Sequence, residues 1–508
     1  MYADIIIKNG RCVTMCGDGG ADWVAAAGKM ICAAGRGDDW QKLVRPGTQV
    51  IDARGGTVLP GFIDNHFHVM QTAVNMMSVD LGGARSHREL GEMLAAAEKR
   101  EGAVLGCQVE ESQFEEKRFP DRYVLDKYCS DSPVVLFSKE YHVSMLNTHA
   151  LLYYKVPFSL EGVELDGSGL PTGIFRRNAN YVLRSNVLRS LPDEFRMEAI
   201  HLAMSRLLEN GITTVAAIEG GWLFDDRDAE FIYAHSGEFP VDMPLFYQTM
   251  DLAKVWKLGL RRVGGNIMVD GTLSSHSAAL SAPYADRPDY RGQIFLPQDG
   301  LDEFVQQCYR QDMQLALYSI GDRAIESVLL AHERAIRQGG STALRHRIEH
   351  AIMATPEQIA RAADMKLIFS VQPAYAYLWG GKGGMYEHRV GERYLRSNDF
   401  AAMFAAGAVV CGGSDSDVTE PRPMLGIHAA VNRAVPRCAV SVEQAIEMYT
   451  VNGAYALFED KRKGKLAPGY LADIVVLDRD IRAVPAEQLE QTDVTVTIKS
   501  GSVLHSRQ

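Results

Sequence analysis

The sequence predicts an α/β fold, a distorted (β/α)8 barrel of the TIM type with a small composite β-sandwich built from both termini. Three observations support this fold class. Eight apolar strand segments alternate with helical segments through the centre of the chain. Both ends of the chain carry short, glycine-punctuated strands instead. The 508 residues also exceed the roughly 250 that a bare barrel needs, which leaves room for a second domain and an insertion.

The terminal segments 1–58 and 465–508 are expected to form the composite β-sandwich. Glycines separate short apolar runs in the first segment, and the last segment has the same texture, with a turn at Ser500-Gly501. The expected strands cover 5–8, 12–14, 23–27, 30–34, 49–52, 473–477 and 494–499. Pairing both ends in one unit is the simplest way to bury their apolar faces.

Residues 59–464 are expected to form the barrel. Its strands should begin near residues 58, 212, 244, 264, 313, 345, 366 and 408. Helix starts are visible as capping boxes at Ser86 and Ser441, and as Thr355 followed by a proline at the first helical position. The excess length lies between the first two strands, so residues 70–195 are expected to be a cap-like insertion over the C-terminal face. A further strand at 134–137 belongs to this insertion.

Composition and charge exclude several classes of protein. Hydrophobic residues make up 46% and charged residues 23%, as in an ordinary soluble protein. The net charge of -11 argues against a general nucleic-acid or anionic-membrane surface. No apolar stretch approaches the roughly 18 residues of a membrane span, and the N-terminus lacks the pattern of a signal peptide. The eight cysteines are scattered without a Cys-x-x-Cys pair, so reduced thiols and a cytoplasmic location are expected.

The most informative motif is His66-Phe67-His68, which ends an apolar segment expected to be the first barrel strand. Residues i and i+2 of a strand point to the same side, so the two imidazoles would face one metal ion. Taken alone, the pair is also compatible with two unrelated histidines in a loop. His350 ends the sixth expected strand and Asp415 follows the eighth. Because a barrel gathers its strand ends at one mouth, these four residues predict a hydrolytic metal site.

Longer motifs are similar to one known family. The sequence resembles the YtcJ-like (amidohydrolase type 3) branch of the amidohydrolase superfamily along nearly its whole length. The motifs that carry the resemblance cover 59–68, 211–215, 269–273, 320–324, 347–351, 372–373, 413–415 and 464–473. The resemblance implies a barrel with a composite sandwich, metal-dependent hydrolysis of C–N bonds in a small-molecule substrate, and a homodimer. It also implies that His66, His68, His350 and Asp415 are metal-site residues.

Four positions depart from the family pattern. Tyr318 stands where the fifth strand usually carries a histidine ligand, and Asn266 replaces a lysine that can bridge two metals. Arg177 replaces a glutamate four residues after Pro-Thr-Gly, and Asp417 replaces a proline. The second-metal ligands are therefore largely absent. Tyr318 would be a further ligand, an oxyanion donor or a packed aromatic residue, and Tyr318, Asn266 and Arg177 are expected to line the substrate site.

The remaining set of His66, His68 and Asp415 predicts one divalent ion per chain, with zinc as the expected metal, because three protein ligands leave room for water. Asp415 would accept the proton of the attacking water. His350 would be either a fourth ligand or a proton donor to the substrate. Both residues are therefore expected to be catalytic.

Weaker candidates lie outside the metal set. His142 falls in a segment similar to one inserted in the family, and is expected either to reach the substrate or to be a structural histidine of the cap. Trp379 follows the seventh strand together with Tyr375 and Tyr377, and would stack on a flat substrate or pack within its loop. Glu219, after the second strand, stays open as a site residue or a stray carboxylate.

The sequence is compatible with three functions. The first is a metal-dependent amidohydrolase that cleaves an amide or cyclic amide of a small organic molecule. The second keeps the barrel but changes the reaction to decarboxylation or C–C cleavage, motivated by the changes at residues 266 and 318. The third is a member that binds a ligand without turning it over, which the intact His66, His68, His350 and Asp415 argue against.

Overall fold

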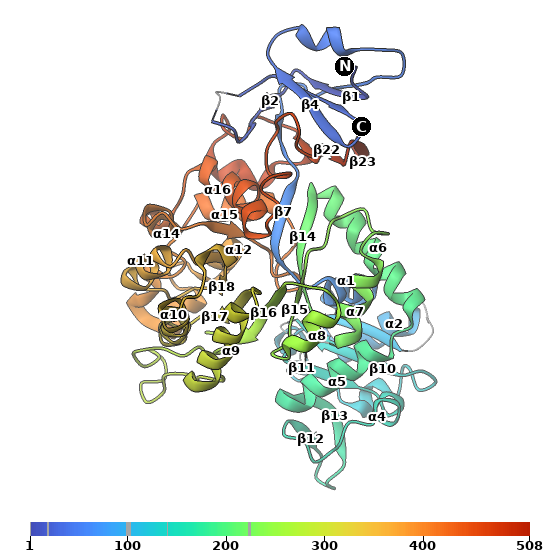
Figure 1. The fold of residues 1–508 in the computed structure, drawn as a ribbon. Helices are drawn as coiled ribbons and strands as arrows, with labels where there is room; N and C mark the ends of the chain where they lie inside the picture. Colours follow the sequence, from blue (N-terminus) through green and yellow to red (C-terminus); the bar gives the residue numbers. More distant parts are fainter. Residues whose placement is uncertain (1, 18–19, 98–102, 140, 222–224, 508) are drawn as a thin grey trace. The chain divides into compact units, whose positions relative to one another are not determined.

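A computed structural model describes residues 2–17, 20–97, 103–139, 141–221 and 225–507 (Figure 1). The chain divides into two compact units. The larger comprises residues 1–67, 204–218 and 233–508, and the smaller comprises 68–203 and 219–232. The boundaries predicted from the sequence, at residues 58 and 465 and around the insertion 70–195, stay predictions.

The larger unit contains the predicted barrel, a sheet of eight strands in the order β20-β19-β18-β17-β16-β15-β14-β7. The strands are β7 (Phe62–Phe67), β14 (Ile212–Glu219), β15 (Leu245–Tyr247), β16 (Arg262–Met268), β17 (Gln314–Ser319), β18 (Arg347–His350), β19 (Ile368–Val371) and β20 (Val410–Gly412). Neighbouring strands are parallel, and nearly all of their residues are buried, which explains the continuous apolar runs.

The two end strands of this sheet meet and nearly close the barrel. A parallel bridge joins Phe67 to Ser416, and the backbone N–H of Asp415 donates to the carbonyl of His66 at 2.8 Å. Gly413 permits this approach, because a Cβ at that position would lie 2.6 Å from the backbone nitrogen of His66. Gly413 is therefore needed where the barrel closes and Asp415 lies beside His66.

Helices follow the barrel strands along the chain. The helices after β15 are α8 (Leu252–Lys257), α9 (Gln298–Arg310), α10 (Asp322–Arg337), α11 (Pro356–Asp364), α12 (Pro373–Trp379), α13 (Met385–Val390), α14 (Phe400–Ala405), α15 (Pro423–Val431), α16 (Val442–Met448) and α17 (Val451–Ala456). The capping boxes at Thr355 and Ser441 are both present, each with a glutamine as the reciprocal partner.

The expected first strand is wrong in one respect. The apolar run from Val58 is two strands, because Thr57–Pro60 forms β6 in a different sheet and only β7 enters the barrel. Gly61 separates them, where a Cβ would lie 2.4 Å from the hydroxyl oxygen of Thr213. The chain therefore passes from one sheet to the other at a residue that has no side chain.

Both termini contribute to two further sheets of the larger unit, and they lie close together in Figure 1. One sheet has the order β4-β3-β1-β5, and the other has the order β2-β6-β21-β22-β23. The strands are β1 (Ile5–Lys8), β2 (Arg11–Cys12), β3 (Trp23–Ala27), β4 (Met30–Gly35), β5 (Gln49–Asp52), β21 (Ile474–Leu477), β22 (Val494–Lys499) and β23 (Ser502–Ser506). One apolar cluster joins residues of both sheets, among them Ile7, Val24, Val58, Ile474 and Ile498.

The smaller unit has its own sheet, in the order β12-β13-β11-β10-β9-β8, over a separate apolar core. The strands are β8 (Val79–Asp80), β9 (Val104–Val109), β10 (Val134–Ser138), β11 (Val143–Leu146), β12 (Val163–Leu165) and β13 (Pro171–Arg176). The helices of this part of the chain are α1 (Val69–Met77), α2 (His87–Ala96), α3 (Arg122–Leu125), α4 (Thr148–Tyr154), α5 (Arg177–Ser190), α6 (Asp193–Glu209) and α7 (Asp226–His235). Ser86 caps α2, but the carboxylate of Glu89 accepts from Arg85 rather than completing the predicted box.

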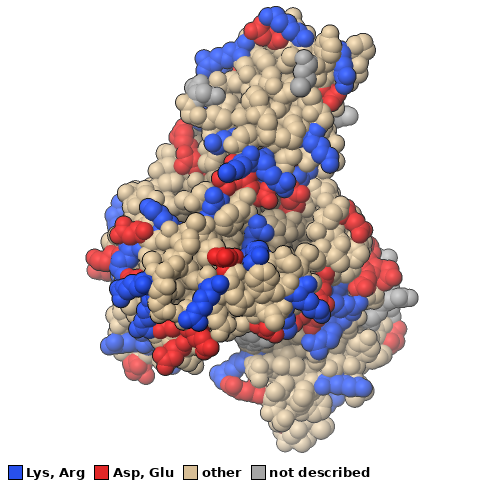
Figure 2. Space-filling model, viewed as in Figure 1, with Lys and Arg blue, Asp and Glu red and all other residues tan. Residues whose placement is uncertain are grey.

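Figure 2 shows Lys and Arg side chains interspersed with Asp and Glu over the face in view. Within the described part of the chain, no helix combines the length and the apolar character that crossing a membrane requires.

Candidate metal centre

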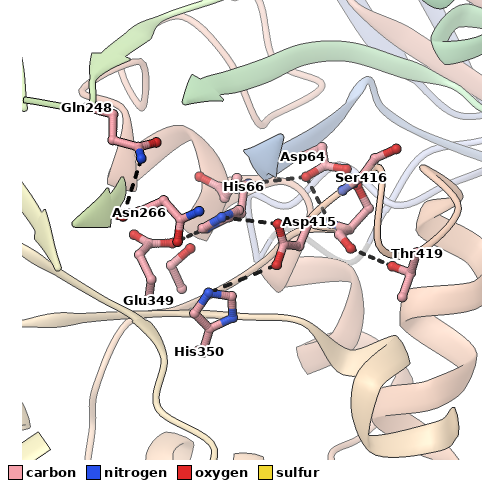
Figure 3. Close-up of polar contacts among 12 residues, drawn as sticks. Asp64, His66, Gln248, Asn266, Glu349, His350, Asp415, Ser416 and Thr419 are labelled. Carbon is pink, nitrogen blue, oxygen red and sulfur yellow. Dashed lines mark hydrogen bonds and ion pairs between the residues drawn. The ribbon is translucent and has the colours of Figure 1, made fainter. Parts of the chain in front are cut away.

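The residues expected to bind metal all lie at or just beyond the carboxyl ends of barrel strands, and Figure 3 shows His66, His350 and Asp415 among them. His66 is the next-to-last residue of β7, and His68 is the N-cap of α1. His350 ends β18, and Asp415 follows β20 by three residues. This placement matches the end of a TIM-type barrel at which active sites are built.

Three of these residues form a cluster with metal-ligand spacing. One ligand atom each of His66, His68 and Asp415 lies within 4.8 Å of the other two, and all three side chains are buried. Nε2 of His66 lies 3.4 Å from Oδ1 of Asp415. Two imidazoles and one carboxylate form a donor set that suits zinc and similar divalent ions.

A buried ion pair determines which nitrogen of His66 faces this cluster. Nδ1 of His66 lies 2.7 Å from Oε2 of Glu349, while Nε of Arg347 donates to Oε1 of Glu349 at 2.7 Å. Burial alone would raise the pKa of Glu349, but the Arg347 guanidinium and the His66 ring hold it at about 2. Because the carboxylate is ionised, it can only accept a hydrogen bond, so the ring proton of His66 is on Nδ1. Nε2 then carries the lone pair, which faces Asp415 and is available to a metal.

The backbone around the site adopts unusual conformations. His350, Ala351 and Asp415 have φ of 69°, 48° and 51°, the left-handed region that non-glycine residues seldom occupy. Buried Asp64 supports the loop with Asp415, because its Oδ1 accepts from the backbone N–H groups of His66 at 3.2 Å and Ser414 at 3.0 Å. Strained conformations of this kind persist where surrounding contacts enforce them, and they cluster at active sites.

His350 lies beside the cluster but outside the three-residue group. Its Nε2 is 4.0 Å from Oδ2 of Asp415, and among the described residues neither ring nitrogen has a hydrogen-bond partner. Burial lowers the pKa of His350 to about 4, so the imidazole is neutral near pH 7. The Tyr318 ring meets His350 edge-on with the ring centres 4.4 Å apart.

Tyr375 is hydrogen-bonded directly to Asp415. Its hydroxyl donates to Oδ2 of Asp415 at 2.6 Å, and its ring is nearly parallel to His350 at a centroid distance of 6.1 Å. Burial, and then the charge of Asp415, raise the pKa of Tyr375 well above its ordinary value. Half-buried Trp379 also packs on Tyr375, with the ring centres 4.7 Å apart.

Asn266 is positioned by a bulge in β16. The pairing of β16 with β17 shifts between Gly264 and Ile267, which leaves Gly265 and Asn266 outside the regular ladder. The two glycines have φ of 91° and 106°, and a Cβ at Gly264 would lie 2.1 Å from the carbonyl oxygen of Ala316. Bulges of this kind redirect side chains next to active sites. The backbone carbonyl of Asn266 accepts from Gln248 at 3.4 Å.

The other predicted site residues belong to the smaller unit. His142 is exposed, and Arg177 is exposed and paired with Glu161 at 2.6 Å. Glu219 is fully buried and accepts from the backbone N–H of Met70 at 3.1 Å, at the start of α1. Burial raises the pKa of Glu219 to about 8. The roles assigned to His142 and Arg177 stay predictions.

Sequence reasoning missed Arg347, Glu349 and Tyr375 as contributors to the site. The first two stood within a recognised motif, and their spacing of two residues on a strand places both side chains on one side. That alternation was a usable signal. Tyr375 was considered only as a stacking residue, and no local pattern indicated its bond to Asp415, forty residues away.

Comparison with known proteins identifies the family and supports the barrel fold. Residues 49–505 match the Amidohydrolase family (Amidohydro_3). YtcJ of Bacillus subtilis, named as an amidohydrolase, is 26% identical over 92% of both chains. The N-substituted formamide deformylase of Arthrobacter pascens is also 26% identical, over 96% of this chain and 95% of its own. A solved metal-dependent hydrolase of Pyrococcus furiosus superposes with a TM-score of 0.80 at 25% identity, covering 94% of this chain and 99% of that one.

A barrel of this topology with a His-His-Asp cluster at its carboxyl end defines a metal-dependent hydrolase fold. The match over most of the length shows that the chain belongs to the amidohydrolase family.

Proposed function

We propose that this protein is a mononuclear, metal-dependent amidohydrolase that cleaves a C–N bond of a small amide. The observation that carries the proposal is the buried cluster of His66, His68 and Asp415, with the tautomer of His66 set by Glu349. A divalent ion, zinc in our proposal, supplies Lewis acidity toward water and a carbonyl group when bound. Tyr318 supports a count of one ion, because the sequence resemblance predicts a metal-binding histidine at this position, and here the position carries a tyrosine ring packed against His350.

Two residues of the chain, Asp415 and His350, would carry out the proton transfer and hold the substrate. Asp415 is held beside His66 by the barrel closure. It would accept the proton of the attacking water and pass it to the leaving nitrogen, which departs as the amine. His350 lies outside the three-ligand group, so we assign it to the substrate rather than to the metal. As a neutral imidazole, it donates a hydrogen bond to the carbonyl oxygen or to the leaving nitrogen.

The surroundings of His350 indicate the kind of substrate. Tyr318, Tyr375 and the partly buried Met268 and Trp379 belong to one apolar cluster on this side of the barrel. An amide with an apolar or aromatic substituent would find matching surface there. The similarity to an N-substituted formamide deformylase supports the same class of substrate.

We also propose that residues 70–195 act as a cap, with His142 and Arg177 contacting the substrate. Asn266, on its bulge, is proposed as a substrate ligand of the barrel itself. A homodimer, a cytoplasmic location and the lack of a nucleic-acid partner stay predictions.

Product analysis tests the proposal. Zinc-loaded protein would be incubated with N-substituted formamides and other small amides that carry aromatic groups, and the free amine and carboxylate would be measured. Equimolar amine and acid are expected. Asp415→Asn should lower the rate by at least about 100-fold, the contribution of a general base. Asp417→Asn, two residues away and only partly buried, is the matched control and should retain activity.

The same assay separates the rival functions. Release of CO2 or of a C–C cleavage product would replace the proposal with the altered chemistry. A protein that binds one of these amides but forms no product after loading with zinc, manganese or iron would be a ligand-binding member.

A further inference from the structure

Tyr375 makes the most direct contact with Asp415 that the proposed mechanism has not used. It is the third residue of α12, a helix that starts with Pro373 directly after β19 and Gln372. Its hydroxyl donates to Oδ2 of Asp415 at 2.6 Å, and both side chains are buried. Hydrogen bonds to an ionised acceptor are shorter and roughly twice as strong as neutral ones.

The two oxygens of Asp415 have different neighbours. Oδ1 faces Nε2 of His66 at 3.4 Å, whereas Oδ2 meets the Tyr375 hydroxyl and lies 4.0 Å from Nε2 of His350. The backbone of Asp415 is held by its N–H bond to His66, but this does not orient the carboxylate plane. The terminal torsion of an aspartate is broad and roughly two-fold, so the plane needs a side-chain partner.

We propose that Tyr375 is a positioning residue that locks the carboxylate of Asp415, keeping Oδ1 on the metal side and Oδ2 on the substrate side. This inference rests on the proposed function, because it assigns metal binding to one oxygen and proton acceptance to the other. The ring of Tyr375 is itself held in place, since it packs against His350 and Trp379 and cannot move away without breaking both contacts.

The test is Tyr375→Phe, which removes the hydroxyl and keeps the ring. Tyr309→Phe is the matched control, because Tyr309 is a buried tyrosine whose hydroxyl is hydrogen-bonded to Nδ1 of His332, outside the proposed site. Three quantities would be measured for each protein, with thermal unfolding as a check of folding. They are the metal content, the visible spectrum after cobalt(II) substitution, and kcat and KM on the amide that the wild-type protein turns over.

Tyr375→Phe should keep one ion per chain, because all three ligands remain. Its cobalt spectrum should change, since the carboxylate loses the hydrogen bond that fixes the direction of Oδ2 and its plane can turn. Its kcat should fall on the order of 10- to 100-fold, the rate equivalent of one hydrogen bond to a charged group, with KM nearly unchanged. Tyr309→Phe should match the wild type in metal content, cobalt spectrum, kcat and KM.

A wild-type cobalt spectrum together with a wild-type kcat in Tyr375→Phe would overturn the inference. Loss of the metal would overturn it as well, because Tyr375 would then maintain the ligand set rather than orient one member. If the wild type hydrolyses no amide, the proposed function fails, but the cobalt spectrum still decides the role of Tyr375. A wild-type protein that binds no cobalt would overturn both.

Discussion

Replacing Glu349 with glutamine is expected to weaken metal binding through His66 without removing any ligand. The carboxylate of Glu349 accepts on both oxygens, from Nδ1 of His66 at 2.7 Å and from Arg347 at 2.7 and 3.1 Å. A glutamine amide has one acceptor and one donor. Either His66 or Arg347 would therefore face an N–H group, and a donor opposite Nδ1 favours the tautomer that blocks Nε2.

The magnitude follows from the environment of this pair. Removing the outer partner of a metal-ligating histidine typically costs about 10- to 100-fold in metal affinity, or about 1.4 to 2.7 kcal/mol. The free energy of unfolding should also fall, independently of the effect on metal affinity. Arg347 is fully buried, and an uncompensated buried charge costs about 3 to 5 kcal/mol. The ring of Phe246, 4.6 Å below the guanidinium, and the bonds to Asn65 and Ser370 would offset part of that cost.

Zinc affinity would be measured by chelator competition, and stability by urea unfolding of the metal-free protein. Glu326→Gln is the matched control, because Glu326 pairs with Arg361 at 2.8 Å on the surface. This control should retain its zinc affinity and lose less than about 1 kcal/mol of stability. A folded Glu349→Gln protein with wild-type zinc affinity would refute the tautomer argument.

Three further predictions concern stability and the cap. Burial lowers the pKa of His332 to about 3. Below about pH 6.5, His332 is therefore protonated in the unfolded chain but stays neutral in the folded one. Between pH 7 and pH 5 the free energy of unfolding should therefore fall by about 2 kcal/mol at this site, and the His332→Gln variant should show a flatter pH dependence. Lys463→Met should lower the free energy of unfolding by about 3 kcal/mol in urea titrations, because buried Lys463 contacts Asp242, Asp473 and the Thr214 hydroxyl; an unchanged midpoint would contradict this. His142→Ala should reduce turnover with one metal ion retained, whereas loss of the ion would make His142 a ligand.

The barrel could be predicted because its signals are local. Buried parallel strands give continuous apolar runs, and helix starts such as Thr355 and Ser441 carry their capping residues in the sequence. The sheet change at Gly61 could not be read in this way, since apolar residues stand directly on both sides of Pro60-Gly61, at Leu59 and at Phe62. The strand β23 and most of the smaller unit's sheet were also missed, because short strands with mixed exposure lack a clear period.

The site was predictable to the extent that its residues stand in motifs at strand ends. His66, His68 and Asp415 were found in this way, and the structure brings them together. The groups that orient them were not found, because each acts through a contact between distant segments. Glu349 meets His66 across 283 residues of sequence, and Tyr375 reaches Asp415 from a helix after a different strand. The alternation of Arg347 and Glu349 indicates that both side chains share one side of a strand, but a single sequence does not indicate which distant residue each of them meets.

The number of metal ions per chain tests the central claim most directly. Elemental analysis would be carried out on protein purified without chelator, and again after reconstitution with zinc. We expect one divalent ion per chain, held by His66, His68 and Asp415, and its loss in His66→Ala. Two ions per chain would contradict the mononuclear site, and none after reconstitution with zinc, manganese or iron would contradict a metal-dependent mechanism altogether.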